Sequence, residues 1–139
     1  MVTSGGQSRR VGGKRATQTS RQLTGDDAEQ RALVHLQRQG LRLVCRNYRL
    51  AGGPFARGAE IDLILWDTDG TLVFVEVRSR ASGSAGGAAA SVTGAKQRRI
   101  VRAAQHYLLQ LAQLPPCRFD VVAIDGDALQ WIRAAFDSA

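Results

Sequence analysis

Several features that mark common protein classes are scarce or missing. The sequence has only two cysteines, Cys45 and Cys117, which lack the spacing of metal ligands, so we expect free thiols in a reducing compartment. No apolar run approaches the ~18–20 residues that span a membrane, and no apolar stretch at the N-terminus indicates a signal peptide. We therefore expect a cytoplasmic protein that does not enter the membrane.

Motifs for nucleotide binding and nucleophilic catalysis are also missing. The chain has no P-loop and no Gly-rich dinucleotide fingerprint. Its two histidines, His35 and His106, are isolated on predicted helices without a Ser, Cys or acid partner at a recognisable spacing. A catalytic triad or zinc site is therefore not expected, whereas 139 residues with 44% hydrophobic content suffice for one domain with a core.

Basic residues outnumber acidic ones, and the excess of positive charge is unevenly distributed along the chain. Of the net charge of +7, residues 1–25 supply +5 because they hold five basic residues and no acid. Residues 1–22 are predicted to form a disordered basic tail, and residues 23–139 a single domain. We interpret the tail as a solvated segment rather than a nucleic-acid arm, although its composition also fits an organellar transit peptide. Seventeen of the nineteen cations are Arg, which suits phosphate contacts or reflects codon bias.

Two runs of apolar, β-branched and aromatic residues, 59–66 and 71–78, predict a β-hairpin. They flank a short polar loop that ends in Gly70, which supplies the left-handed conformation of a three-residue loop. Alternation of side chains then divides the first strand into two faces. One face carries Glu60, Asp62, Ile64 and Trp66, and the other carries Ile61, Leu63 and Leu65.

The loop type sets the register of this hairpin. A three-residue loop pairs Asp67 with Thr71. Counting back, Asp62 lies opposite Glu76 with the Cβ atoms roughly 4.5–5.5 Å apart, where like charges destabilise each other. A slip of one residue would separate them. A bound divalent cation explains the pair, because Mg²⁺ takes one or two carboxylates with phosphate and water oxygens. Alternatively, one carboxylate points into solvent at a strand end and the other pairs with an Arg.

A helix is predicted from a start near Thr24, which can cap it, to about residue 39, with Gly40 as its stop. Glu29 lies on the apolar stripe of this helix, at helical spacing from Leu33. A carboxylate in that position is at the rim of the buried face or has a partner. The rim is the simpler interpretation when the residue is considered alone.

The remaining segments complete an α/β pattern. They comprise strands at residues 41–49, 118–124 and 129–132, and a helix from Ser91 or Thr93 to about Leu114. Residues 82–90, before this helix, are small, and they either order over a substrate or serve as a passive linker. The order α-β-β-β-α-β-β predicts an α/β domain with a mixed central sheet flanked by helices.

The first half of the second predicted helix is strongly cationic. It carries Lys96, Arg98, Arg99 and Arg102 and no acid. Helix charges commonly form a solvated face, but four uncompensated cations are candidate contacts for DNA phosphates. Such contacts carry no sequence information and favour recognition by shape.

Several of these residues, in order and at matching spacing over residues 23–136, resemble the bacterial YraN family. The matching segments are Thr24–Asp26, Glu29, Gly58–Ile64, Phe74–Arg78, Ala90–Thr93 with Lys96, and Arg118–Val122. That family is grouped with the restriction-endonuclease-like PD-(D/E)xK superfamily and is similar to archaeal Holliday-junction resolvases. The resemblance implies a restriction-endonuclease-like core and, by analogy with the resolvases, a homodimer.

The resemblance also assigns roles. Asp62 and Glu76 match the two motif acids that bind Mg²⁺ or Mn²⁺, and Glu29 matches an extra acid that the resolvases use. In such enzymes the metal polarises the scissile phosphate and activates a water molecule. The expected catalytic residues are therefore Asp62, Glu76 and Arg78. The expected metal ligands are Asp62, Glu76 and Glu29.

Arg78 departs from the superfamily pattern, which usually has Lys at this position. An Arg side chain cannot act as a general base, although it can stabilise negative charge on the phosphate. Lys96, at the start of the second helix, is a candidate substitute for the missing Lys. A different role for Arg78 is a cross-strand ion pair with Glu60, which the hairpin register places opposite it.

Three classes of function follow. The first is a metal-dependent DNA endonuclease that hydrolyses phosphodiester bonds, acting on branched or structured DNA. The second is a non-catalytic nucleic-acid-binding or adaptor module on a degenerate nuclease fold. The third is a structural protein whose acids are merely paired with arginines.

Overall fold

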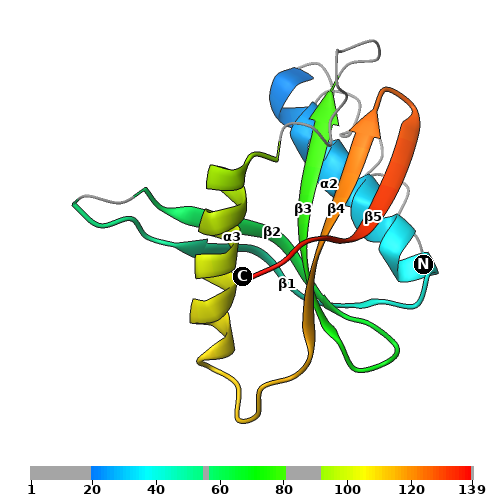
Figure 1. Cartoon of the computed structure of the whole chain (residues 1–139). Coiled ribbons are helices and arrows are strands. Elements are labelled where there is room, and N and C mark those ends of the chain that lie inside the picture. The colour runs from blue at the N-terminus through cyan, green and yellow to red at the C-terminus, as the bar shows by residue number, and fades with distance from the viewer. Residues whose placement is uncertain (1–19, 55–56, 81–91, 139) are drawn as a thin grey trace, which may run out of the picture.

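Five strands form one mixed sheet with a helix packed on each face (Figure 1). The computed structural model describes residues 20–54, 57–80 and 92–138. In chain order the elements are α2 (Ser20–Arg38), β1 (Arg42–Leu50), β2 (Ala59–Trp66), β3 (Leu72–Arg80), α3 (Gly94–Leu108), β4 (Cys117–Asp125) and β5 (Ala128–Phe136). The predicted α/β architecture, a mixed sheet flanked by helices, is confirmed.

The strands lie side by side in sequence order, from β1 to β5. All neighbours are antiparallel except β3 and β4, which are parallel. The parallel pair follows from the crossover through α3, since a tight turn can join only antiparallel strands. β3 and β4 are also the strands with the longest buried runs, as expected for inner strands covered on both faces.

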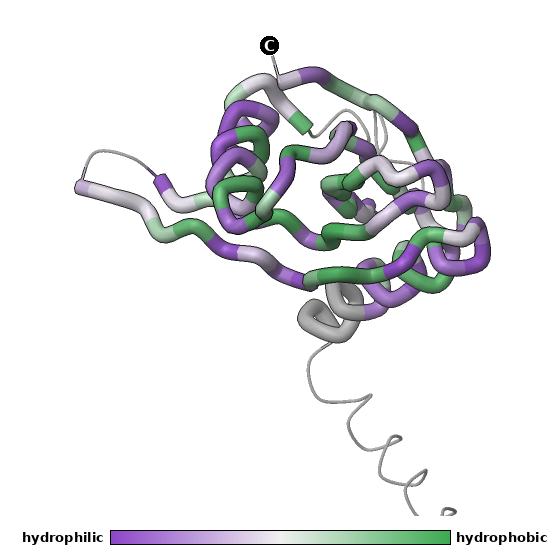
Figure 2. The backbone as a smooth tube through the Cα atoms, turned by 90° about the horizontal axis from the view of Figure 1, so that it is seen from below, coloured by the Kyte–Doolittle hydropathy of each residue, from purple (hydrophilic) through white to green (hydrophobic). Residues whose placement is uncertain are grey.

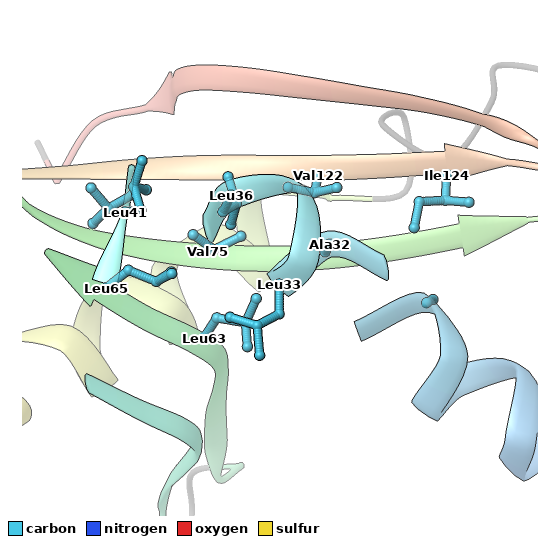
Figure 3. Packing of buried hydrophobic residues seen from close by; sticks show 11 residues of the cluster. Ala32, Leu33, Leu36, Leu41, Leu63, Leu65, Val75, Val122 and Ile124 are labelled. Atoms are coloured by element: carbon cyan, nitrogen blue, oxygen red, sulfur yellow. The ribbon is translucent and has the colours of Figure 1, made fainter. Parts of the chain in front are cut away.

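The α2 side of the sheet has its own hydrophobic core. Figure 3 shows Leu33 and Leu36 of α2 packed against Leu63, Val75 and Val122 of the sheet. Each of these side chains is at most 5% exposed. Burying a Leu or Val side chain contributes about 1.5–3 kcal/mol, so this cluster holds α2 firmly against β3.

The opposite face is covered by α3. There Ile100 and Ala104 pack in one cluster with Ile64, Phe74 and Phe119. The rings of Phe74 and Phe119 are stacked with centroids 5.5 Å apart. Figure 2 shows the resulting division along the backbone, with hydrophobic central strands and helices that alternate between hydrophobic and hydrophilic residues. This packing places α3 over β2 and β1, on one side of the sheet (Figure 1).

The helix ends differ from the sequence-based expectation. α2 begins at Ser20, upstream of the predicted start at Thr24 and within the predicted tail. A capping residue allows a helix to start but does not prevent the preceding residues from continuing it. The rest of the predicted tail and the small-residue segment 82–90 lie outside the described residues. The stop at Gly40 is confirmed by its left-handed φ of 98°.

α3 is shorter than predicted. It ends at Leu108, not near Leu114, because the next N–H groups donate three residues back in tight turns, as in the 3.1 Å bond from Leu111 N to Leu108 O. These turns redirect the chain toward β4, and Leu114 is 77% exposed instead of buried. At the other end Thr93 caps the helix as expected, accepting a hydrogen bond from Lys96 N at 3.2 Å.

Candidate active site

The β2–β3 hairpin has the predicted register. Asp67 N donates to Thr71 O at 2.8 Å, and Gly70 has a left-handed φ of 90°. From this turn the paired residues run from Trp66↔Leu72 to Leu63↔Val75. The three-residue loop inferred from the sequence is therefore correct.

Beyond the Leu63↔Val75 pair the two strands part, and Figure 1 shows β2 running past α3 while β3 continues beside β4. Asp62 bridges the gap with its side chain, because its Oδ2 atom accepts a hydrogen bond from Val77 N at 2.8 Å. The carboxylate thus takes the place of a strand carbonyl. The strands carry Asp62 and Glu76 to the same point without a backbone pair between them.

The departure of β2 also corrects the predicted face of Ile61. Strict alternation put Ile61 on the same face as Leu63. In the structure Leu63 packs in the α2-side core, whereas Ile61 packs with Ile64 in the α3-side core. Alternation holds only while the strand stays in the plane of the sheet, and β2 leaves that plane at Asp62.

Asp62 and Glu76 form a pair of carboxyl groups close enough to influence each other's pKa. Burial, together with the nearby charge of Glu76, raises the pKa of Asp62 to about 7, although the Val77 N–H opposes the shift. Burial also raises the pKa of Glu76, which is 3% exposed, even though Lys96 and Arg78 act in the other direction. Protonation of the pair therefore persists to a higher pH than that of an exposed carboxyl group.

Two cations approach the same oxygen of this pair. Arg78 Nη1 lies 3.3 Å from Glu76 Oε2, and Lys96 Nζ lies 3.6 Å from it. Glu60, the partner considered for Arg78, forms an ion pair with Arg49 at 3.7 Å instead. Arg78 is thus turned toward the acid pair, and the N-terminal turn of α3 brings Lys96 to the site.

These residues line one cavity of about 310 Å³. Its lining comprises Ala28, Glu29, Asp62, Glu76, Val77, Arg78, Ser79 and Lys96. Asp62, Glu76 and Arg78 are therefore brought together with Lys96. Ser79 was missed, since alternation from Arg78 would turn it to the other face of the strand.

Glu29 lines the cavity but pairs elsewhere, because its Oε1 atom lies 3.7 Å from Arg46 Nη2. Within residues 20–54, 57–80 and 92–138, no three His, Cys, Asp or Glu side chains lie close enough together to hold a metal ion. Asp62 and Glu76 offer two carboxylates to a cation, with other positions open to water or phosphate oxygens. Glu29, in the lining of the same cavity, stays a predicted third ligand.

The four cations predicted to contact DNA phosphates do not share one surface. Lys96 and Arg99 line a groove beside the acid cavity, whereas Arg98 and Arg102 line a separate hollow near the C-terminus. The helical spacing explains this division, because residues three or four apart share a face and adjacent ones do not. The four candidate phosphate contacts of α3 are therefore divided between two surfaces.

No helix in the described ranges combines the length and apolar character that a membrane span requires. The model of the uncharacterised protein family UPF0102 matches residues 28–124 of the chain. A UPF0102 protein of Methylibium petroleiphilum is 67% identical over 115 residues, which cover 83% of this chain and 94% of that protein. A UPF0102 protein of Paracidovorax citrulli is 60% identical over 126 residues, covering 91% of each chain.

Proposed function

The chain belongs to the uncharacterised protein family UPF0102, the YraN family, and from its carboxyl pair we propose that it is a metal-dependent DNA endonuclease that hydrolyses phosphodiester bonds. The observation that carries the proposal is the meeting of Asp62 and Glu76, with raised pKa values, in a cavity that also contains Arg78 and Lys96. A buried acid and a half-buried acid beside two cations provide ligands for a divalent cation and positive charge for a phosphate in one place.

The donor set fits Mg²⁺ or Mn²⁺. Both prefer oxygen ligands, and Mg²⁺ is commonly held by one or two carboxylates with water and substrate phosphate. The raised pKa values of Asp62 and Glu76 support the fit, because a divalent cation would compete with protons for the pair and relieve the repulsion between the carboxylates. Such a cation, when bound, supplies Lewis-acid polarisation of the phosphate and a more acidic water.

The chain's own residues have separable tasks in this proposal. Asp62 and Glu76 hold the cation, and the hydrogen bond from Val77 N orients the Asp62 carboxylate. Arg78 and Lys96 stabilise the negative charge that develops on the phosphate. Arg78 cannot take a proton from the attacking water, because a guanidinium is not a general base in proteins. Ion pairing to Glu76 keeps both cations at the site before substrate binds.

Branched or structured DNA is the proposed substrate class. The described cations can contact phosphates, which position a nucleic acid without reading its sequence, so recognition by shape is expected. A homodimer is proposed by analogy with the junction resolvases, whose substrates have two-fold symmetry.

The test is cleavage of junction, flap, single-stranded and duplex DNA by the purified protein with Mg²⁺ or Mn²⁺. Asp62→Asn and Glu76→Gln keep the shape of each side chain, and we expect each to lower the cleavage rate by about 10³-fold or more. Asp127→Asn, in the exposed turn between β4 and β5, is the matched control and should cleave at the parent rate. Lys96→Met should cleave more slowly than the parent but faster than Asp62→Asn.

The two remaining function classes are outcomes of the same test. DNA binding without cleavage, unaffected by Asp62→Asn, would refute the endonuclease and favour a non-catalytic binding or adaptor module. Failure to bind any of these DNAs at low salt would refute both nucleic-acid functions.

A further inference from the structure

A second hollow, next to the acid cavity, has a distinct composition. It is a groove of about 560 Å³ lined by Arg49, Leu50, Ala51, Arg57, Gly58, Ala59, Glu60, Lys96, Arg99 and Ile100. One wall is the far end of the β1–β2 hairpin, and the other is the first half of α3, which crosses that hairpin in Figure 1. Lys96 lines both the groove and the acid cavity, so the two lie side by side with this residue at their border.

The groove is cationic on both walls. Arg49 and Arg57 come from the hairpin, and Lys96 and Arg99 come from α3, against a single acid, Glu60, in the lining. The Arg49 side chain is 75% exposed and its contact with Glu60 is 3.7 Å long, so the guanidinium is accessible to a ligand. A pair this exposed contributes little and is easily exchanged for a stronger phosphate contact.

A hydrogen bond links the hairpin wall of the groove to α3. Arg102 Nη2 donates to the backbone carbonyl of Arg57 at 2.7 Å, across 45 residues of sequence. This bond uses the backbone of Arg57 and leaves its guanidinium for other contacts. Arg102 therefore stabilises the position of the hairpin wall, while its side chain lines a different hollow.

We propose that this groove binds one strand of DNA by its sugar-phosphate backbone and leads it to the acid cavity, an inference that rests on the proposed nuclease function for the destination of the strand. Its volume lies in the range of small-ligand pockets, about 300–1,000 Å³, which suits a few nucleotides of one strand and not a duplex. Cations on two facing walls surround a single backbone, whereas a duplex presents its phosphates on a broad convex surface. None of the described residues that line the groove is aromatic, so the contacts they offer are to the backbone and independent of sequence.

The test measures binding of a fluorescent single strand of about 12 nucleotides, within the usual site size of such grooves, in EDTA so that nothing is cleaved. The Arg49→Ala/Arg57→Ala variant should lower the salt dependence of binding by about 1.4 in slope and weaken binding roughly ten- to sixty-fold at about 50 mM salt. The matched control is Arg38→Ala/Arg42→Ala, which removes two exposed Arg side chains outside the groove and should bind like the parent protein. A blunt duplex of equal length should bind more weakly and lose less on removal of the groove arginines.

Equal losses in the groove and control variants, or tighter binding of the duplex than of the single strand, would overturn the proposal. The proposed nuclease fails separately, because its readout is cleavage in Mg²⁺ by protein with an intact groove. Groove-dependent binding without cleavage would therefore support the strand groove and refute the nuclease. Cleavage of DNA by the Arg49→Ala/Arg57→Ala variant at the parent rate and KM would support the nuclease and refute the strand groove.

Discussion

The β2–β3 hairpin has acids at both of its ends, and their pKa values shift in opposite directions at the two ends. Where the strands part, burial raises the pKa values of Asp62 and Glu76, and the two cationic contacts, both to Glu76, are 3.3 and 3.6 Å long. At the turn end, Asp67 lies 2.8 Å from Arg118 Nη1 and also accepts from Thr68 N at 2.6 Å. Burial raises the pKa of Asp67, but these hydrogen bonds more than offset it and lower the pKa overall.

Asp120 of β4 completes the turn-end cluster. It is fully buried, and its two oxygens accept hydrogen bonds from Arg118 Nε, from Trp131 Nε1 at 2.9 Å and from Ala134 N at 2.9 Å. Arg118 is thus held between Asp120 and Asp67, and these bonds raise its pKa against the effect of burial.

The difference separates a well-compensated cluster of acids from an incompletely compensated one. At the turn end each buried acid has donors at close distance, so its charge stabilises the fold. At the open end two acids face each other with incomplete compensation, which costs stability unless a ligand supplies the missing positive charge. The following predictions test this contrast, beginning with the largest expected effect.

Removing the buried acid of the turn-end cluster should be strongly destabilising. Asp120→Ala leaves Arg118 and Trp131 Nε1 without their shared partner, and breaking a buried ion pair costs about 3–5 kcal/mol. Urea unfolding followed by circular dichroism measures the loss. The exposed Asp127→Ala should change the free energy of unfolding by less than about 0.5 kcal/mol. Equal effects of the two substitutions would contradict a structural role for the cluster.

Neutralising Asp62, at the end of the hairpin where the strands part, should raise the free energy of unfolding and so stabilise the protein. The pKa of Asp62 is raised from 3.8 to about 7 on folding, so its stabilising protonation is complete below about pH 4 and is lost as the pH rises through 7. Asp62→Asn avoids this loss and still accepts the Val77 N–H. We expect it to raise the free energy of unfolding by about 1–3 kcal/mol at pH 8 and by less at pH 5.

The same measurement can contradict this assignment. A destabilised Asp62→Asn protein at pH 8 would mean that the ionised carboxylate is well compensated, as at the turn end. Asp67→Asn is the comparison, and it should be less stable than the parent protein at pH 8 because the pKa of Asp67 is lowered on folding.

A divalent cation should stabilise the protein only through the open end. At a concentration ten times its Kd, Mg²⁺ or Mn²⁺ should add about 1.4 kcal/mol to the free energy of unfolding. The thermal shift should be larger at pH 8 than at pH 6, since binding must displace the proton of the Asp62 and Glu76 pair. Asp62→Asn should lose the shift and Asp127→Asn should keep it. A shift that survives in Asp62→Asn would place the cation elsewhere.

The smallest expected effect concerns the rim of the turn-end cluster. Arg133 Nη2 lies 3.2 Å from Asp67 Oδ2, but its side chain is 56% exposed and also lies over the Trp131 ring at 4.7 Å. Exposed pairs contribute about 0.2–1 kcal/mol, so Arg133→Gln should lower the free energy of unfolding by no more than that. A loss as large as that of Asp120→Ala would show that the rim, and not the buried acid, holds the cluster together.

The hairpin shows how far reasoning from the residues can reach. The side-chain period of two and the three-residue loop ending at Gly70 were enough to predict the register, because both are local properties of the backbone. The same logic failed at Ile61, since alternation cannot predict where a strand leaves its sheet. It failed again at the end of α3, where the apolar spacing continues to Leu114 but the chain turns at Leu108.

The candidate site also combines residues whose proximity could be predicted from the sequence with one that could not be placed. Asp62, Glu76 and Arg78 lie on adjacent strands of one hairpin, so their proximity could be predicted. Lys96 could not be placed, because its distance from Glu76 depends on how α3 packs across the sheet, through Ile100 and Ala104. That packing is set by contacts between segments distant in sequence.

By itself, the sequence determined the order of elements, the hairpin register and the identity of the two acids that meet. Local dihedral preferences and the periods of helix and strand are sufficient for these. Only the tertiary structure decided which cations face the acids. It turned Arg78 and Lys96 toward Glu76, paired Glu29 with Arg46, and split the α3 cations between two surfaces. The reason is physical, since long flexible side chains are oriented by the burial and charge around them, which exist only once the sheet and helices have packed.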